Sequence, residues 1–211
     1  MELNIKPYPQ NNLYDCATAC FRTALEHTID KHRLSFKVTS MSTIRDNSGY
    51  VKNHGTVIEN AVDPLNRWLM PHGIKFNFPS SVPEKFEILQ NLLSSKTVPI
   101  VSVPYEELCK LLKPRSQPAP TSHCVCVYDF DYADKQVKIM DPAFNLIVPT
   151  EQKFVIDECR LKIPLNSFSK LWFAQGPEVY WFDRCEPASV IRKRDVNKQK
   201  ESLFYYGEVG R

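Results

Sequence analysis

Apolar side chains in the first half of the chain recur at helical spacing. The first such stripe predicts a helix from Asp15 to about Thr28, and Asp15 is suited to be its N-cap. Residues 30–55 are mixed and polar, and Asn47–Gly49 predicts a turn among them. The apolar members of the stripe are Ala17, Cys20, Phe21, Ala24 and Leu25.

A cleaner amphipathic pattern predicts a second helix over Val57–Met70, which Gly73 would end. Pro64 lies inside this helix and predicts a kink or a split there. Beyond it, Lys75–Phe78 suits a short strand. Pro83–Leu93 then predicts another helix, with the proline in its first turn.

Strand patterns dominate the second half of the chain. A β-type run over Val98–Val103 precedes a helical segment, Tyr105–Leu112, and a proline-rich connector, KPRSQPAP. Cys124–Phe130 and Gln136–Met140 then predict two strands joined by a turn around Ala133-Asp134. Helices first and strands later favour an α+β fold with an antiparallel sheet. The remaining predicted elements are a strand over Leu146–Val148, a helix over Leu165–Trp172 and a strand over Glu178–Phe182.

Composition places the chain among ordinary soluble globular proteins, with 43% hydrophobic and 24% charged residues. A net charge of +3 is too small to indicate nucleic-acid binding. No apolar run is long enough to span a bilayer, and the N-terminus does not resemble a secretory signal. We therefore expect a cytoplasmic protein, with secretion as an effector by a specialised route as the alternative. We expect a main domain over residues 1–185 and a tail over residues 186–211 that either docks or stays solvated.

Seven cysteines occur, and their odd number without a secretory signal argues against a disulfide framework. No Cys-x-x-Cys pair is present, so zinc-ribbon and thioredoxin-like motifs have no support. Most intracellular cysteines are small buried hydrophobes, and we interpret Cys20, Cys159 and Cys185 in this way.

Cys16 differs from the other cysteines because it lies in the first turn of the predicted helix. The helix dipole and the free N–H groups there favour a thiolate, which is the nucleophilic form of cysteine. Gln10, six residues earlier, is placed to donate its side-chain amide to the oxygen that gains charge during acyl transfer. Taken alone, Cys16 would be a core cysteine and Gln10 a surface residue. Their spacing favours a catalytic pair.

His123 begins one predicted strand and Asp141 ends the next. In an antiparallel hairpin these two ends are neighbours, so we expect the two side chains to meet. The carboxylate would hold the imidazole in the tautomer that a general base for Cys16 requires. The sequence therefore predicts a Cys-His-Asp arrangement.

Three alternatives to this arrangement stay open. His123, Cys124 and Cys126 have the residue types of a metal cluster, although strand alternation sends His123 and Cys124 to opposite faces. Asp141-Pro142 also suits a simple turn start. His54 is the rival base, but no acid on a following strand accompanies it. We expect neither a metal ion nor a cofactor.

Four segments of the chain resemble the bacteriocin-processing, double-glycine leader peptidases, which belong to the papain-like cysteine peptidases. QNNLYDCATAC resembles their nucleophile segment, and SHCVCVYDFDYADKQVKIMDPA resembles their histidine strand, turn and Asp-Pro-Ala strand. KTVPIVSV and LNSFSKLW resemble the flanking segments. Ala17 departs from the family, which usually has glycine after the nucleophile, and extra residues precede the histidine.

The resemblance implies a papain-like fold, in which a helix carrying the nucleophile packs against an antiparallel sheet carrying the histidine and the aspartate. It implies that Cys16 is the nucleophile, His123 the base and acid, Asp141 the residue that orients the imidazole, and Gln10 the oxyanion donor. Residues 1–185 would form this catalytic domain. The family is usually fused to a membrane transporter, whereas here we expect a stand-alone bacterial enzyme.

Four functions are compatible with these features. The first is a cysteine peptidase or amidase that acts through an acyl-enzyme. The second is an acyltransferase of natural-product biosynthesis, which moves an acyl group from a carrier protein or another thioester to an amine. The third is an effector-type protease or glutamine deamidase. The fourth, a binding module without activity, is disfavoured by the complete set of Cys, His, Asp and Gln. We expect a peptide, protein or acyl-carrier substrate and no nucleic acid or membrane partner, and the oligomeric state stays open.

Overall fold

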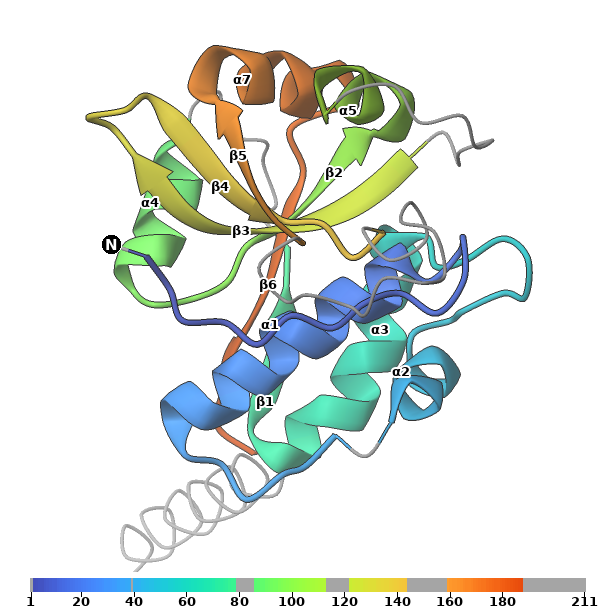
Figure 1. The fold of residues 1–211 in the computed structure, drawn as a ribbon. Coiled ribbons are helices and arrows are strands. Elements are labelled where there is room, and N and C mark those ends of the chain that lie inside the picture. Colours follow the sequence, from blue (N-terminus) through green and yellow to red (C-terminus); the bar gives the residue numbers. More distant parts are fainter. Residues whose placement is uncertain (1, 39, 79–85, 113–121, 144–158, 188–211) are drawn as a thin grey trace, which may run out of the picture.

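Three helices precede the first strand of the chain (Figure 1). The computed structural model describes residues 2–38, 40–78, 86–112, 122–143 and 159–187. Helix α1 begins one residue after the predicted start, with Asp15 at the N-cap position, and ends one turn later than expected, where Arg33 adopts a left-handed conformation with φ 52°. The three helices are α1 (Cys16–His32), α2 (Met41–Asn47) and α3 (Ile58–Leu69).

Helix α2 was not predicted, because it has only seven residues and buries only two of them, Met41 and Ile44. Ser40 caps it by accepting a hydrogen bond from the backbone N–H of Thr43 at 3.2 Å. A short turn with so few buried positions shows no helical period in the sequence. The predicted turn does occur after it, where Gly49 has φ 68°.

Helix α3 continues across Pro64 as one element. A 3₁₀ turn, η1 (Met70–His72), follows it, and Gly73 ends this turn at φ 77°, a left-handed conformation that favours glycine. The predicted stop is therefore confirmed, and Pro64 does not split the helix.

Within the described residues, six strands form one antiparallel sheet in the order β1-β6-β2-β3-β4-β5. Strand β4 has the predicted bounds, and β1, β2, β3 and β6 each overlap their predicted ranges. The α+β fold class with an antiparallel sheet is therefore confirmed. The strands are β1 (Ile74–Asn77), β2 (Ile100–Pro104), β3 (Ser122–Asp131), β4 (Gln136–Met140), β5 (Arg160–Pro164) and β6 (Val179–Arg184).

Strand β5 was missed because only Ile163 among its residues is buried, so the segment lacks a clear apolar alternation. The predicted strand over Leu146–Val148, the start of the helix predicted from Pro83 and the greater part of the 186–211 tail lie outside the described residues. The remaining helices, close to their predicted ranges, are α4 (Glu87–Ser94), α5 (Tyr105–Leu112) and α7 (Leu165–Ala174).

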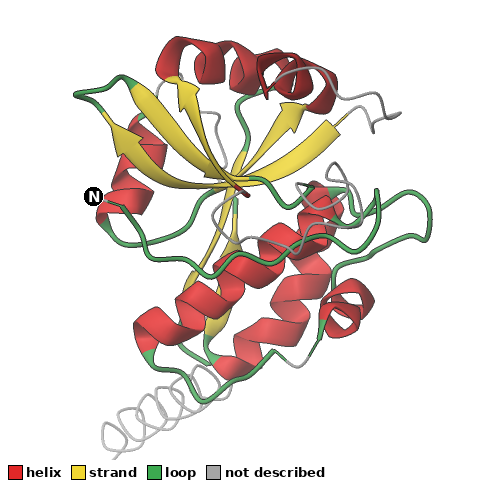
Figure 2. Cartoon of the chain, in the orientation of Figure 1, coloured by secondary structure: helices red, strands yellow, loops and turns green. Residues whose placement is uncertain are grey.

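Helices α1, α2 and α3 lie together on one side of the molecule, whereas α5 and α7 cover the other face of the sheet (Figures 1 and 2). Strand β6 runs from the sheet into the helical part, where it pairs with β1. Aromatic side chains join the two parts there, and Phe21 of α1 meets Phe76 of β1 edge to face at 5.2 Å. Among the described residues, no helix combines the length and the hydropathy needed to cross a membrane.

Candidate functional site

The start of α1 is held by Asp15, whose carboxylate is fully buried. Asp15 occupies the predicted N-cap position, but its side chain makes no hydrogen bond to the helix. It accepts instead from Asn12 Nδ2 at 2.8 Å and from Arg45 Nε at 2.9 Å, and a second guanidinium nitrogen of Arg45 also pairs with it. The expected capping role of the side chain is therefore wrong. Arg45 lies on α2, so its ion pair with the buried carboxylate joins α2 to the first turn of α1. The charge of Arg45 compensates the buried negative charge.

His123 and Asp141 meet at the edge of the β3–β4 hairpin, as predicted. His123 Nε2 donates to Asp141 Oδ1 at 2.6 Å, and both side chains are buried. Asp141 Oδ1 also accepts the backbone N–H of Ala143 at 2.8 Å. The two hydrogen bonds fix the carboxylate, and the carboxylate in turn fixes the orientation of the imidazole.

Cys16 is the first residue of α1 and hydrogen-bonds to the side chains of both Cys124 and His123. The hydrogen bond with Cys124 acts most strongly on the pKa of the Cys16 thiol; burial raises this pKa, and the hydrogen bond and charge of His123 lower it. The net effect holds the pKa of Cys16 well below its usual range. The thiolate is therefore the favoured form of this sulfur.

The pKa of His123 shifts in the opposite direction. Burial opposes its charged form, but the charge of Asp141, the hydrogen bond from His123 to that carboxylate, and Cys16 together raise the pKa of His123 to about 10. The two opposite shifts favour a thiolate at Cys16 beside an imidazolium at His123. The ring of Tyr105 packs edge-on against the imidazole with centroids 4.7 Å apart and shields its face.

Gln10 lies six residues before Cys16 in the chain but is anchored by other groups. Its backbone N–H donates to the carbonyl of Pro142 at 2.9 Å, next to Asp141. Its side-chain Nε2 donates to the carbonyl of Asn12 at 2.8 Å, and its buried Oε1 has no hydrogen-bond partner among the described residues. An amide nitrogen carries two protons, so one proton of Nε2 is left for another acceptor.

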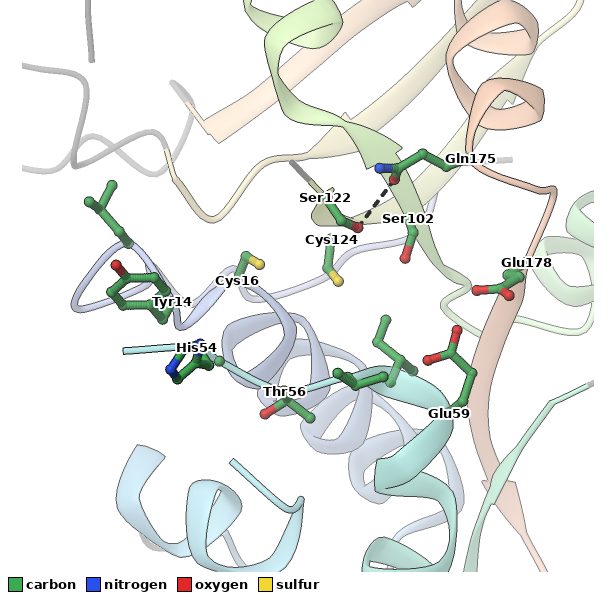
Figure 3. A pocket seen from close by; sticks show the side chains of 14 residues that line it. Tyr14, Cys16, His54, Thr56, Glu59, Ser102, Ser122, Cys124, Gln175 and Glu178 are labelled. Atoms are coloured by element: carbon green, nitrogen blue, oxygen red, sulfur yellow. Dashed lines mark hydrogen bonds between the residues drawn. The ribbon is translucent and has the colours of Figure 1, made fainter. Parts of the chain in front are cut away.

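A cavity of about 440 Å³ opens beside Cys16, between the helical part and the sheet (Figure 3). Cys16 and Cys124 both line it, together with Ser102, Ser122 and residues 54–59 at the start of α3. His123, Asp141 and Gln10 do not line it. The sulfur of Cys16 is therefore the part of the site that a molecule in this cavity meets first.

One end of the cavity is acidic. Glu59 of α3 and Glu178, just before β6, face each other there in Figure 3. Glu178 accepts a hydrogen bond from the hydroxyl of Tyr180 at 2.9 Å. Burial raises the pKa of Glu178 because it disfavours the charged form, and the nearby Glu59 raises it further, while the hydrogen bond from Tyr180 opposes the shift. This end of the cavity therefore suits a positively charged or neutral group better than a carboxylate.

Sequence reasoning missed three residues of this site. Cys124 was considered only as a metal ligand, yet it lies beside Cys16 and lowers the pKa of that thiol. Arg45 lies on helix α2, which was not predicted. The sequence pattern placed Tyr105 in a helix but did not indicate that it contacts the histidine. Cys185 was expected in the core but is only half-buried, whereas Cys20 and Cys159 are buried as expected.

The structure also bears on the two alternatives, His54 as the base and a metal cluster. His54, the rival base, lines the cavity from the loop before α3 and is exposed. Within the part of the chain that the structure describes, no three His, Cys, Asp or Glu side chains are grouped so that they could hold a metal ion.

Two of the comparisons with known proteins found a match, one to a family model and one to a solved structure. The model of the Peptidase_C39 like family matches residues 2–172. The crystal structure of a candidate C39-like peptidase from Bacillus anthracis superposes with a TM-score of 0.58 at 12% sequence identity, and the match covers 88% of this chain and 99% of that one. At this identity the structural match shows a shared fold. No curated protein matches the chain at a significant level.

Proposed function

This chain belongs to the Peptidase_C39 like family, a family of cysteine peptidases, and from that premise we propose that Cys16, His123 and Asp141 are its catalytic triad. The enzyme would hydrolyse a peptide bond through an acyl-enzyme on Cys16. A peptide or protein substrate follows from the family.

The observation that carries this proposal is the position of His123 between the other two residues. Its Nε2 is bonded to Asp141 Oδ1 at 2.6 Å, and its side chain is also hydrogen-bonded to Cys16. One ring nitrogen is therefore taken by the carboxylate, which leaves Nδ1 for the sulfur. This is the arrangement that a nucleophile, a base and an orienting acid require.

The reaction begins with the Cys16 thiolate attacking the carbonyl carbon of the scissile bond. The His123 imidazolium then gives its proton to the departing amine, and the acyl group stays on the sulfur. In the second half, neutral His123 takes a proton from water, which attacks the thioester and releases the acid. Throughout both halves of the reaction, Asp141 stabilises the imidazolium and holds the neutral ring in the required tautomer.

The oxygen of the tetrahedral intermediate needs hydrogen-bond donors. The backbone N–H of Cys16 belongs to the first turn of α1, where N–H groups have no partner within the helix. The second proton of Gln10 Nε2 is the other donor that we propose. The pairing of Gln10 with Pro142, next to Asp141, supports this assignment because it ties Gln10 to the same end of the sheet.

We also propose that residues 1–185 form the catalytic domain and that residues 186–211 are a tail. Support comes from the core, since buried side chains from Leu3 to Phe182 form one cluster.

Alkylation with iodoacetamide near pH 6 tests the nucleophile. Cys16 is only 9% exposed, whereas Cys109 and Cys185 are more exposed. Labelling by exposure alone would therefore reach Cys109 and Cys185 first. Because burial raises the pKa of Cys185 whereas that of Cys16 is lowered, we expect Cys16 to be labelled first. Earlier labelling of Cys109 or Cys185, located by peptide mapping, would contradict the assignment.

Intact-mass spectrometry tests the reaction itself. The protein is incubated with mixed peptides and, separately, with acylated carrier proteins. We expect an acyl adduct from peptides that is absent in Cys16→Ala and decays in water with release of the acid. An adduct formed only from acyl carrier proteins, which decays only when an amine is added, would instead identify an acyltransferase.

A further inference from the structure

Four cysteines face one another across the contact between α1 and β3. Cys16 and Cys20 are one turn apart on α1, and Cys124 and Cys126 are two residues apart on β3. The thiol of Cys20 donates to the carbonyl of Cys124 at 3.3 Å, and the thiol of Cys126 donates to the carbonyl of Cys20 at 3.7 Å. These bonds lock the helix and the strand side by side at this level.

The spacing pairs the thiols one to one. Four residues of helix rise about 6 Å, and two residues of strand rise about 6.7 Å, so the two repeats nearly match. The thiol of Cys16 accordingly lies beside that of Cys124, and the thiol of Cys20 beside that of Cys126, close enough for each to shift the pKa of its neighbour. We call these the outer pair and the inner pair.

The two pairs differ in what can reach them. Both members of the outer pair line the cavity, where Figure 3 shows the two sulfurs beside each other. Both members of the inner pair are fully buried and do not line it. The inner pair is therefore a control for the outer pair: it has the same chemistry and a matching contact but no access to the cavity.

We propose that the outer pair is an oxidative modification site, at which a hydroperoxide converts Cys16 and Cys124 into a disulfide. The thiolate of Cys16 attacks one oxygen of the peroxide, the O–O bond breaks, and Cys16 becomes a sulfenic acid. The departing alkoxide or hydroxide takes a proton from solvent and leaves as an alcohol or water. The Cys124 sulfur then attacks the Cys16 sulfur, the S–O bond breaks, and hydroxide leaves with the Cys124 proton as water. The peroxide is reduced by two electrons, and the two thiols are oxidised.

Geometry favours this second step over further oxidation of Cys16. The two sulfurs lie beside each other in the cavity, on a helix and a strand that the hydrogen bonds of Cys20 and Cys126 hold together, so a partner thiol stands next to Cys16 when it is oxidised. Without a partner thiol, a sulfenic acid is open to oxidation to sulfinic acid, which is generally irreversible. A disulfide is reversed by thiols. If Cys16 is the nucleophile, as proposed above, the bridge blocks catalysis and protects the enzyme at the same time.

The test is mild treatment of the whole protein with hydrogen peroxide, followed by alkylation of free thiols and mass spectrometry. We expect the protein to lose two hydrogens and to regain them with dithiothreitol. Trypsin leaves Cys16 and Cys20 together in the peptide 1–22, and Cys124 and Cys126 together in the peptide 116–135. Both candidate bridges therefore join the same two peptides, and fragment ions must locate the bond.

Variants separate the two pairs. Cys126→Ser is expected to keep the bridge, whereas Cys124→Ser is expected to lose it and to gain two oxygens on Cys16 instead. Fragment mapping of the unmodified chain decides the question even if a variant does not fold. A Cys20–Cys126 bridge, or doubly oxygenated Cys16 beside an intact Cys124 thiol in the wild type, would overturn the proposal.

The mass readout does not depend on turnover, so the two proposals fail separately. A bridged protein that keeps full peptidase activity would refute Cys16 as the nucleophile while leaving the modification site intact. An active peptidase whose Cys16 is oxidised without a bridge would do the reverse.

Discussion

The two sides of the site are built in different ways. On the sheet side, neighbouring strands β3 and β4 place His123 and Asp141 together, and the contact is held by the hairpin register, in which Cys126 lies opposite Met140. On the N-terminal side, residues 10–16 form no strand and no backbone ladder. Apart from isolated backbone hydrogen bonds, such as that from Gln10 to Pro142, they are held by individual side-chain contacts. The chief one is the buried pair between Asp15 and Arg45.

This difference predicts how each side responds to substitution. A backbone ladder survives the loss of one side chain, so changes on the sheet side should affect chemistry more than folding. An irregular segment depends on each contact. Changes on the N-terminal side should therefore reduce stability, and they should reduce activity because the fold is weakened. The predictions below test this contrast.

The largest effect is expected at Asp141. Asp141→Asn keeps the size of the side chain but removes the charge that holds the His123 tautomer, and it replaces one carboxylate oxygen with an amide nitrogen that donates. By comparison with the equivalent change in other triads, we expect turnover to fall by about 10⁴-fold. Activity assays and urea unfolding of the same preparation measure the two quantities. Equal losses of turnover and stability would show that Asp141 is structural and would break the contrast.

The sheet side could be predicted from sequence because its contact depends on a hairpin. His123 and Asp141 are 18 positions apart, and two clear strand patterns with a turn between them are enough to bring them together. Asp15 and Arg45 are 30 positions apart and meet through α2, a helix too short to show a period. Strand β5 was missed for a related reason, since only Ile163 in it is buried. Contacts set by tertiary packing, such as that of Cys124 with Cys16, leave no periodic signal.

The second largest effect is expected at Arg45. Arg45→Met leaves the fully buried Asp15 carboxylate without its charged partner. Breaking a buried pair on one side costs about 3–5 kcal/mol. Arg45 itself is 25% exposed, so we expect the lower end of that range in the free energy of unfolding. Lys110→Met, which removes an exposed ion pair on α5, is the control and should leave unfolding unchanged.

A smaller effect on chemistry is expected at Gln10. Removing one oxyanion donor typically costs about 2.7–4 kcal/mol of transition-state stabilisation, which appears in kcat/KM. Gln10→Ala should therefore reduce kcat/KM by about 10²–10³-fold, and Asn11→Ala, at the exposed neighbouring position, should not. If Gln10→Ala lowers stability and leaves kcat/KM intact, the hydrogen bond to Asn12 is its whole role and the oxyanion assignment is wrong.

The smallest effect is a change of activity with pH in the unmodified enzyme. The pKa of His123 is raised to about 10, so the imidazolium that protonates the leaving amine persists through neutral pH and is lost as the pH rises through that value. Turnover should therefore stay level above the lowered pKa of Cys16 and reach half of its plateau near pH 10. The charge of Asp141 raises this pKa, so the residual activity of Asp141→Asn should decline at a lower pH than that of the wild type. If both enzymes show the same alkaline decline, the group that titrates there is not His123, and the sheet side of the site does not set the proton chemistry.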